Sequence, residues 1–411
     1  MSANPGAAWT CPFCPLACDH LGLRADGPAL ALAGGHCTRA QEALAGFGAV
    51  ASPSIDGRPV ALDDAIAEAA RRLGQSRLPL AAGLGCDVAG ARALYPLLAA
   101  TGAVSDSAGG DAFAEGLRAL QDRGQFTTTL AEVRTRADLL VLVGPPPIAM
   151  APLLWQRLGL GETMARHVAT LGAPEPDFEG VGPAVTHEGV GEGGDLFDLV
   201  AQLALAVLRP GAAVPPPVAA LAARLRRARY AVAGRRAAAA AGTGGAAHGK
   251  GARHRAPAQP RHARGGAVDR RRQRRRHRQP GLHVAFRRAG AFARGSARAG
   301  TRTAPVRQPA SAGRRRGRLL LWVSAFEPGA RPPETSLPSI GIAHPGQAAA
   351  FARPGSVFIP VATPGIDHAG HLFRTDGTVL MPLAAVRAAS LPPVADVAAR
   401  LHAALTSKAS A

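Results

Sequence analysis

One stretch of 84 residues, 235–318, limits what the rest of this chain can build, because it cannot contribute to a hydrophobic core. It holds 24 Lys and Arg residues against one acid, Asp269, and contains no isoleucine, no glutamate and one leucine. Such a composition buries too little apolar surface to offset the entropy that is lost on ordering the chain. The 411-residue chain is therefore expected to fold from the ordinary sequence on either side.

Three explanations fit residues 235–318. A basic disordered insert could bind RNA or DNA, although only Phe286 and Phe292 could stack on bases. A solvated linker needs no partner. A shifted reading frame, entered near Ala233 and left near Arg318, also gives this composition, because the codons of Ala, Arg, Gly and Pro begin with two G or C bases. We favour the shifted frame. The net charge of +20 resides in this segment, so no nucleic-acid partner is expected.

Four of the five cysteines lie near the start of the chain: Cys11, Cys14, Cys18 and Cys37. Thiolates crowded in this way hold a soft cation, either in an iron–sulfur cluster or as zinc. The first ten residues lack the basic and apolar regions of a secretory signal, so we expect a cytoplasmic protein, in which disulfides are rare. Three cysteines in one tight loop favour a [4Fe–4S] cluster. Zinc, with His20 and His36 as rival ligands, and an emptied relic site are the alternatives.

The ordinary sequence alternates helices and strands. We predict helices at 62–73, 88–101, 199–208 and 218–227, and strands at 78–85, 137–144 and 356–360. Such alternation predicts an α/β fold with doubly wound parallel sheets, which bind ligands at the carboxyl ends of their strands. Cys86 follows a predicted strand and is expected to be a small buried residue. The apolar run 196–208 is expected to form a buried helix and is too short to span a membrane.

Four parts of the chain follow from these patterns. Residues 1–55 form a Cys-rich lobe of the iron–sulfur type, and residues 56–232 form an α/β domain. Residues 233–318 are the Arg/Ala/Gly-rich segment, either disordered or frameshifted. Residues 319–411 form a C-terminal α/β portion.

Four segments, in this order, resemble the B-type subunit of formylmethanofuran dehydrogenase, and the resemblance covers roughly residues 8–232 and 319–405. The segments are TCPFCPLACDHL (10–21), ALQDRGQFTTTLAEVRTRADLLVLVG (119–144), LLWVSAFEP (320–328) and IPVATPGIDHAGHLFRTDG (359–377). That family belongs with the molybdopterin or tungstopterin oxidoreductases. Its bacterial versions resemble the second subunit of the formyltransferase/hydrolase complex of one-carbon metabolism.

The resemblance implies that the four cysteines hold one [4Fe–4S] cluster. It also implies a Cys-His pair shortly before the ALQD segment, where sulfur binds tungsten or molybdenum and imidazole handles a proton. This chain has Ser105-Asp106-Ser107-Ala108-Gly109-Gly110-Asp111 there, with neither cysteine nor histidine. Glycine neither binds a metal nor transfers a proton, so binding of the molybdopterin or tungstopterin metal and carbon dioxide reduction are doubtful. Asp106 and Asp111 are expected to be solvated loop carboxylates rather than ligands of a hard cation.

The C-terminal turn carries the other predicted site. In pterin-binding relatives this lobe holds the nucleotide tails of the cofactor, which implies binding roles for Asp367, His368 and Arg374. The alternative is a capped loop with a local Arg374–Asp376 or His368–Asp367 contact. The isolated residues His187 and Asp195 are expected at the surface.

These implications point to a scaffold subunit that has lost the tungsten or molybdenum ligand. It would belong to a complex that moves a formyl group through a methanofuran-type carrier to formate, and the partner subunits would perform the chemistry. The rival hypotheses are a redox-active pterin-dependent dehydrogenase subunit and a nucleic-acid-binding protein that uses residues 235–318.

Overall fold

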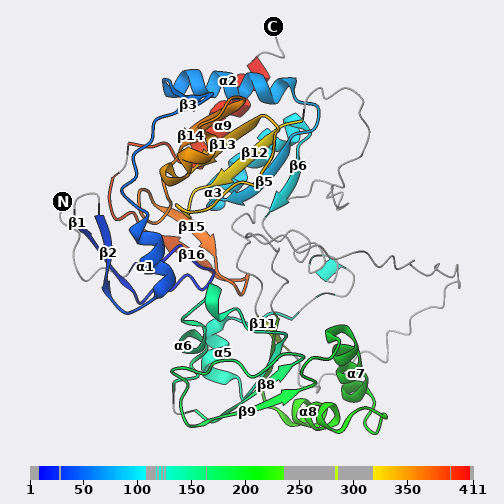
Figure 1. Cartoon of the computed structure of the whole chain (residues 1–411). Coiled ribbons are helices and arrows are strands. Elements are labelled where there is room, and N and C mark those ends of the chain that lie inside the picture. Colours follow the sequence, from blue (N-terminus) through cyan, green and yellow to red (C-terminus); the bar gives the residue numbers. More distant parts are fainter. Residues whose placement is uncertain are drawn as a thin grey trace, which may run out of the picture.

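The computed structural model describes residues 9–26, 29–107, 117, 120–121, 124, 126–162, 164–235, 283–285, 318–388 and 390–407. Two parallel sheets form its centre, and a small N-terminal lobe lies beside both of them (Figure 1). The mixed α/β class predicted from the sequence is confirmed. Apart from β11, the Arg/Ala/Gly-rich segment 236–317 lies outside the described residues, and so does the nucleic-acid hypothesis that depends on it.

The larger sheet has seven strands in the order β4-β3-β14-β13-β12-β5-β6. The first five of its strands in chain order are β3 (Ser54–Ile55), β4 (Arg58–Pro59), β5 (Leu80–Gly85), β6 (Val104–Ser107) and β12 (Leu320–Ser324), followed by β13 (Ser339–Ala343) and β14 (Ser356–Pro360). β14, β13, β12, β5 and β6 are parallel, and the β3–β4 hairpin adds an antiparallel edge. The chain runs outward from β5 to β6 on one side and from β12 to β14 on the other. The topological switch point therefore lies between β5 and β12.

Three helices cover one face of this sheet: α2 (Leu62–Gln75), α3 (Val88–Thr101) and α9 (Val394–Ser407). α2 begins with Asp63 and Asp64 and carries Arg72 in its last turn, as the helix dipole favours. The opposite face packs against the 3₁₀-helix η3 (Pro345–Phe351) through Phe351 and Phe358. The predicted helices on both faces are thus replaced on one face by η3, because only a few residues connect β13 to β14.

The smaller sheet has five parallel strands in the order β11-β10-β7-β8-β9. They are β7 (Leu139–Val143), β8 (Arg166–Leu171), β9 (Val185–Val190), β10 (Ala231–Arg235) and β11 (His283–Ala285). α5 (Leu130–Arg136), η1 (Ile148–Met150) and α6 (Leu154–Leu158) precede β8. α7 (Leu196–Leu208) and α8 (Pro216–Arg227) follow β9. α5 and α6 pack on one face, and α7 and α8 pack on the other, so this sheet is doubly wound.

The helix predicted to be buried at 199–208 is only half-covered. α7 buries Leu199 and Leu203 against the sheet, but Phe197 is 81% exposed and Leu208 is 76% exposed. The prediction was wrong because an apolar residue occupies nearly every position of the helix, whereas the sheet contacts one side of it.

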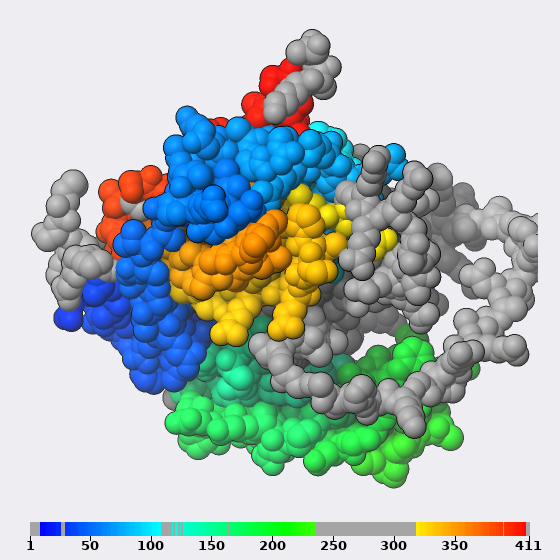
Figure 2. Space-filling model, turned by 45° about the horizontal axis from the view of Figure 1, so that its top comes forward, coloured from blue at the N-terminus to red at the C-terminus, as the bar shows by residue number. Residues whose placement is uncertain are grey.

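The N-terminal lobe contains an antiparallel hairpin, β1 (Gly22–Asp26) and β2 (Ala29–Gly34), followed by α1 (Thr38–Ala45). A second hairpin, β15 (Gly370–Phe373) and β16 (Leu380–Leu383), lies between the lobe and the larger sheet. Figure 2 shows the N-terminal residues against both the C-terminal part and the part that contains the smaller sheet. Among the described residues, no helix is long and apolar enough to cross a membrane.

Candidate functional site

The loop with three cysteines is closed by its own backbone. The N–H of Cys11 donates to the carbonyl of Cys18 at 2.8 Å, and the N–H of Ala17 donates to the carbonyl of Cys14 at 3.1 Å. Ala17 takes a left-handed conformation with φ of 43°. Cys37 caps α1 at the end of the β-hairpin. All four thiols are buried, and together they are called the four-cysteine site (Cys11, Cys14, Cys18 and Cys37).

The thiols of this site interact with one another. Cys18 donates its S–H to Cys14, which lowers the pKa of Cys14 to about 7 and, together with burial, raises the pKa of Cys18. Burial raises the pKa of Cys11 and of Cys37, and the charge of Cys14 adds to both shifts. Cys14 therefore lies within electrostatic reach of the other three and is the thiol that ionises most readily.

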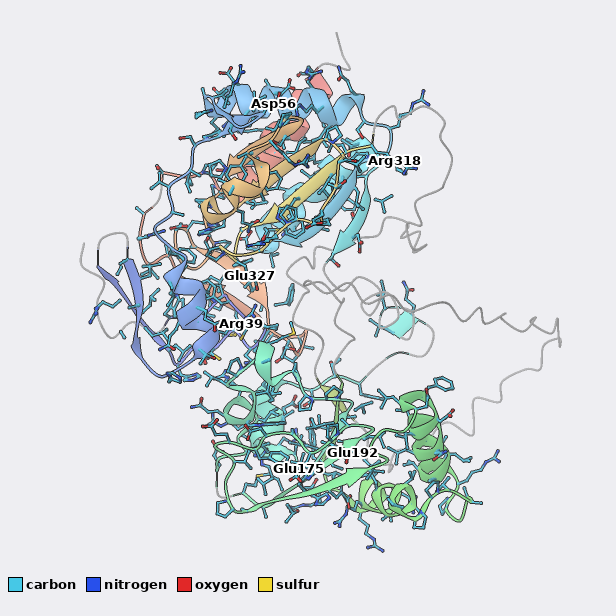
Figure 3. The ribbon with its side chains drawn as sticks, viewed as in Figure 1. Arg39, Asp56, Glu175, Glu192, Arg318 and Glu327 are labelled. Carbon is cyan, nitrogen blue, oxygen red and sulfur yellow. The ribbon has the colours of Figure 1, made fainter. Side chains whose placement is uncertain are left out.

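Two arginines accompany the four-cysteine site. Arg39, in the first turn of α1, donates from Nε to the carbonyl of Phe13 at 2.7 Å and pairs with Glu327. Figure 3 shows Arg39 and Glu327 side by side where the lobe meets the larger sheet. Arg157, in α6, donates from Nη1 to Asp19 Oδ1 at 2.9 Å. Its Nε is buried without a hydrogen-bond partner.

The donor set fits an iron–sulfur cluster, because the four ligands are soft, buried thiols that adjoin two guanidinium groups. In the part of the chain that the structure describes, no three Cys, His, Asp or Glu side chains converge to hold a single metal ion. A cluster binds each thiolate to a different iron, so its ligands need not converge on one point.

The predicted C-terminal turn lies at the carboxyl edge of the larger sheet, at the switch point between β5 and β12. Thr363 Oγ1 donates to the carbonyl of Ala325, directly after β12. Gly370 lies against Asp87, which follows β5, and a Cβ at Gly370 would come within 2.7 Å of Asp87 Oδ2. The chain's own turn thus fills the position where open α/β sheets bind ligands.

Two of the three predicted pterin-binding side chains are engaged in internal ion pairs. Asp367 accepts from the N–H of Thr363 at 2.8 Å and from Nε of Arg387 at 2.7 Å. Arg374 pairs with Asp376, with 2.7 Å from Nε to Oδ2 and 2.6 Å from Nη2 to Oδ2. Of the two local contacts that the sequence allowed, the Arg374–Asp376 pair is the one present.

His368 takes a different position from its predicted partner. Its Nδ1 lies 2.7 Å from the carbonyl oxygen of Ala369, and its Nε2 is buried without a hydrogen-bond partner. Asp367 faces away toward Arg387. The assignment of Asp367, His368 and Arg374 to a cofactor thus stays a prediction.

The four-cysteine site and the C-terminal turn lie together although more than 300 residues separate them in sequence. Trp9 Nε1 donates to the carbonyl of Gly365 at 2.8 Å, and the N–H of Thr375 donates to the carbonyl of Pro15 at 2.7 Å. Asp376 Oδ2 also accepts from the N–H of Leu130, at 3.3 Å, and so ties this junction to α5.

A buried histidine completes the junction. His344, directly after β13, accepts from the N–H of Gly346 and packs edge-on against Phe47 of the lobe, with 4.7 Å between ring centres. The guanidinium of Arg387 lies over the ring of Phe47, 5.7 Å from its centre. Burial lowers the pKa of His344 to about 4, against the smaller opposite effect of Asp367.

The remaining predicted residues lie apart from the junction or at its edge. Ser105, Asp106 and Ser107 belong to β6, the edge strand, and Asp111 lies outside the described residues. Cys86 is fully buried at the end of β5, as predicted. Asp195 caps α7 by accepting from the N–H of Asp198.

His187 is half-buried rather than at the surface. Its Nε2 lies 3.0 Å from Thr170 Oγ1, and its Nδ1 lies 3.3 Å from Glu175 Oε1. The prediction was wrong because β9 pairs with β8 and places Thr170 beside the ring.

Sequence reasoning did not identify Arg39, Arg157 or His344. Each is a single residue whose partner comes from a distant segment, so no spacing pattern marks it. A cavity of about 570 Å³, lined by residues that include Arg331, Gln347 and Arg353, lies next to η3. The predicted site residues are not among those that line it.

Comparison with known proteins agrees with the resemblance that the sequence segments indicated. No family model matches the chain. Over 93 residues the chain is 38% identical to the B-type subunit of the formyltransferase/hydrolase complex Fhc of Methylorubrum extorquens, a match that covers 23% of this chain and 26% of that relative. The match thus spans about a quarter of the curated relative.

A solved structure is similar over a greater length. The crystal structure of the formyltransferase/hydrolase complex (FhcABCD) from Methylorubrum extorquens, in complex with methylofuran, matches with a TM-score of 0.58 and 20% sequence identity. The match covers 88% of this chain and all of the matched chain. This likeness shows the fold, and the 93-residue match confirms the resemblance to the B-type subunit of the formyltransferase/hydrolase complex that the four sequence segments indicated.

Proposed function

We propose that this chain is a scaffold subunit of a formyltransferase/hydrolase complex, similar to the B-type subunit of the relative from Methylorubrum extorquens. The observation that carries the proposal is the 93-residue match to such a subunit, together with the shared fold over 88% of the chain. The complex would transfer a formyl group from a tetrahydropterin to the amine of a methanofuran-type carrier, and would then hydrolyse the formyl-carrier to formate. The partner subunits would perform both steps.

Loss of the tungsten or molybdenum site from this chain is part of the proposal. Residues 105–107 at the end of β6 offer hydroxyls and a carboxylate where the family has sulfur and imidazole. The side chains implied to hold a pterin nucleotide are also engaged, since Asp367 pairs with Arg387 and Arg374 pairs with Asp376. The filled switch point supports a structural role for the turn.

We further propose that the four-cysteine site holds a [4Fe–4S] cluster. When bound, such a cluster supplies one-electron chemistry and a rigid cross-link between the loop and α1. The protein's part is to bury the four thiols and to lower the pKa of Cys14, which makes that thiol available as thiolate near neutral pH.

The test is purification of the tagged full-length chain from its native host, with partners identified by mass spectrometry. We expect a formyltransferase and a metal-dependent amidohydrolase-type subunit, formate release from a formyl-tetrahydropterin donor, and neither tungsten nor molybdenum in the metal analysis. Stoichiometric tungsten or molybdenum would instead establish the redox-active alternative. Formate release that continues unchanged after this chain is deleted from the host would contradict the scaffold role.

A further inference from the structure

Arg39 and Arg157 reach the four-cysteine site from two different helices, α1 and α6. We propose that these two arginines are positioning residues for a cluster in that site: Arg39 holds the fourth cysteine against the loop, and Arg157 presents a donor and a positive charge beside Cys18. This inference rests on the proposed cluster and adds residues that the cysteine pattern does not contain.

Arg39 connects three segments. It follows Cys37 by two residues, and its Nε bond to the carbonyl of Phe13 fixes the start of α1 to the middle of the cysteine loop. Its pairing with Glu327, beyond the end of β12, anchors the same guanidinium to the larger sheet. Because Cys37 comes from a separate element, the distance between it and the loop depends on this contact.

Arg157 lies on the other side of the loop sequence. Its Nη1 bonds Asp19 and lies 3.3 Å from Nδ1 of His20, the two residues that follow Cys18. The side chain is 13% exposed, and its Nε has no hydrogen-bond partner. An unpaired buried donor is rare and costly. A cluster sulfide or the Cys18 thiolate is an acceptor of the kind that this N–H lacks.

The electrostatics agree with the geometry. The charge of Arg39 favours the thiolate forms of Cys11, Cys14 and Cys37, and the charge of Arg157 favours that of Cys18. A cluster with four thiolates is negative in both oxidation states and gains one further negative charge on reduction. Nearby cations therefore stabilise the reduced state more, so their removal should lower the reduction potential.

The experiment is anaerobic reconstitution of the full-length chain with iron and sulfide. The variants are Arg157→Gln, Arg39→Gln and Arg39→Lys, with Arg58→Gln, on the exposed strand β4, as the matched control. Iron and sulfide content, electron paramagnetic resonance, and a potentiometric titration with dithionite are measured. Circular dichroism establishes that each variant is folded.

Two results are expected. Arg157→Gln should keep four irons but shift the oxidised-to-reduced ratio at a fixed potential by about tenfold, which is a fall of about 59 mV in the potential. Arg39→Gln should lose the iron bound to Cys37 and give a three-iron signal when oxidised. Arg39→Lys should keep the potential of its four-iron fraction while still losing iron, because lysine keeps the charge but lacks the two-pronged contact.

The outcomes separate the two proposals. If folded Gln variants load four irons at the unchanged potential, the role of the arginines is overturned while the cluster stands. If the unmodified chain takes up no iron and sulfide, the cluster is overturned, and the arginine proposal with it. Neither outcome affects the association with partner subunits, which the purification tests.

Discussion

The two faces of the smaller sheet are covered in different ways. Leu140 and Leu142 of β7 face a core shared with α5, α6 and the N-terminal lobe. The alternate residues, Leu139 and Val141, face α7 and α8. The first face is locked by buried polar contacts such as the Arg374–Asp376 pair, whereas α7 leaves much apolar surface uncovered. A parallel sheet needs cover on both faces, and here polar contacts select which segment covers the first one.

The largest expected effect breaks the locked face. Asp376→Ala removes the partner of Arg374 and the acceptor of the Leu130 N–H, which leaves a buried charge unpaired. We expect a loss of about 3 to 5 kcal/mol in the free energy of unfolding, measured by urea denaturation. Asp64→Ala, at an exposed position of α2, is the control and should change stability little. Equal effects of both variants would contradict the view that buried polar contacts hold the lobe.

The next effect concerns pH at the same junction. Burial lowers the pKa of His344 from 6.5 to about 4, with Asp367 and Arg387 as the charged neighbours. Between these values the unfolded chain binds a proton that the folded chain does not, so stability should fall as the pH decreases from about 6.5 to about 4. The loss is on the order of 3 kcal/mol.

His344→Gln is the matched variant for the pH experiment. It should be less stable at pH 7, since it lacks the ring against Phe47, but its stability should depend less on pH in this window. Urea denaturation at several pH values measures both. If the slope is the same in the variant, another group causes it.

The third prediction sharpens the contrast within α7. Leu203→Ala opens space in a core and should cost about 2 kcal/mol, whereas Leu208→Ala, at a position 76% exposed, should stay within about 0.5 kcal/mol. The two substitutions are chemically identical and lie on one helix, so each controls for the other. A large loss at Leu208 would mean that its side chain is covered in solution.

The smallest expected effect is at the start of α5. Thr129 and Glu132 form a capping box, with the Glu132 N–H donating to Thr129 Oγ1 at 3.1 Å and the Thr129 N–H donating to Glu132 Oε2 at 3.0 Å. Thr129→Ala should cost about 1 kcal/mol. Thr135→Ala, exposed on the same helix, should cost less; thermal denaturation compares them.

Much of the secondary structure could be predicted because it depends on neighbouring residues. The helix at Val88–Thr101 and the strand at Ser356–Pro360 have the predicted bounds. Exposure of α7 could not be predicted, because a uniformly apolar helix does not indicate which side packs. Nor could the place of β12 between β13 and β5, because the order of strands depends on contacts across hundreds of residues.

The candidate site shows the same division. The cysteines stood out by their spacing, and the structure buries all four. Asp367 and Arg374 stood out by a motif, but their partners Arg387 and Asp376 decide what they do. Arg39 and Arg157 carry no local mark, since their partners belong to other elements.

The pairing of β5 with β12 has a consequence for synthesis on the ribosome. Leu80 pairs with Leu320, 240 residues later, so β5 and β6 leave the exit tunnel long before the strand that completes their sheet. At about 5 to 20 residues per second, that wait is on the order of tens of seconds. During this interval the apolar edge of β5 is open to other nascent chains, and a chaperone that shields it should raise the yield of folded protein.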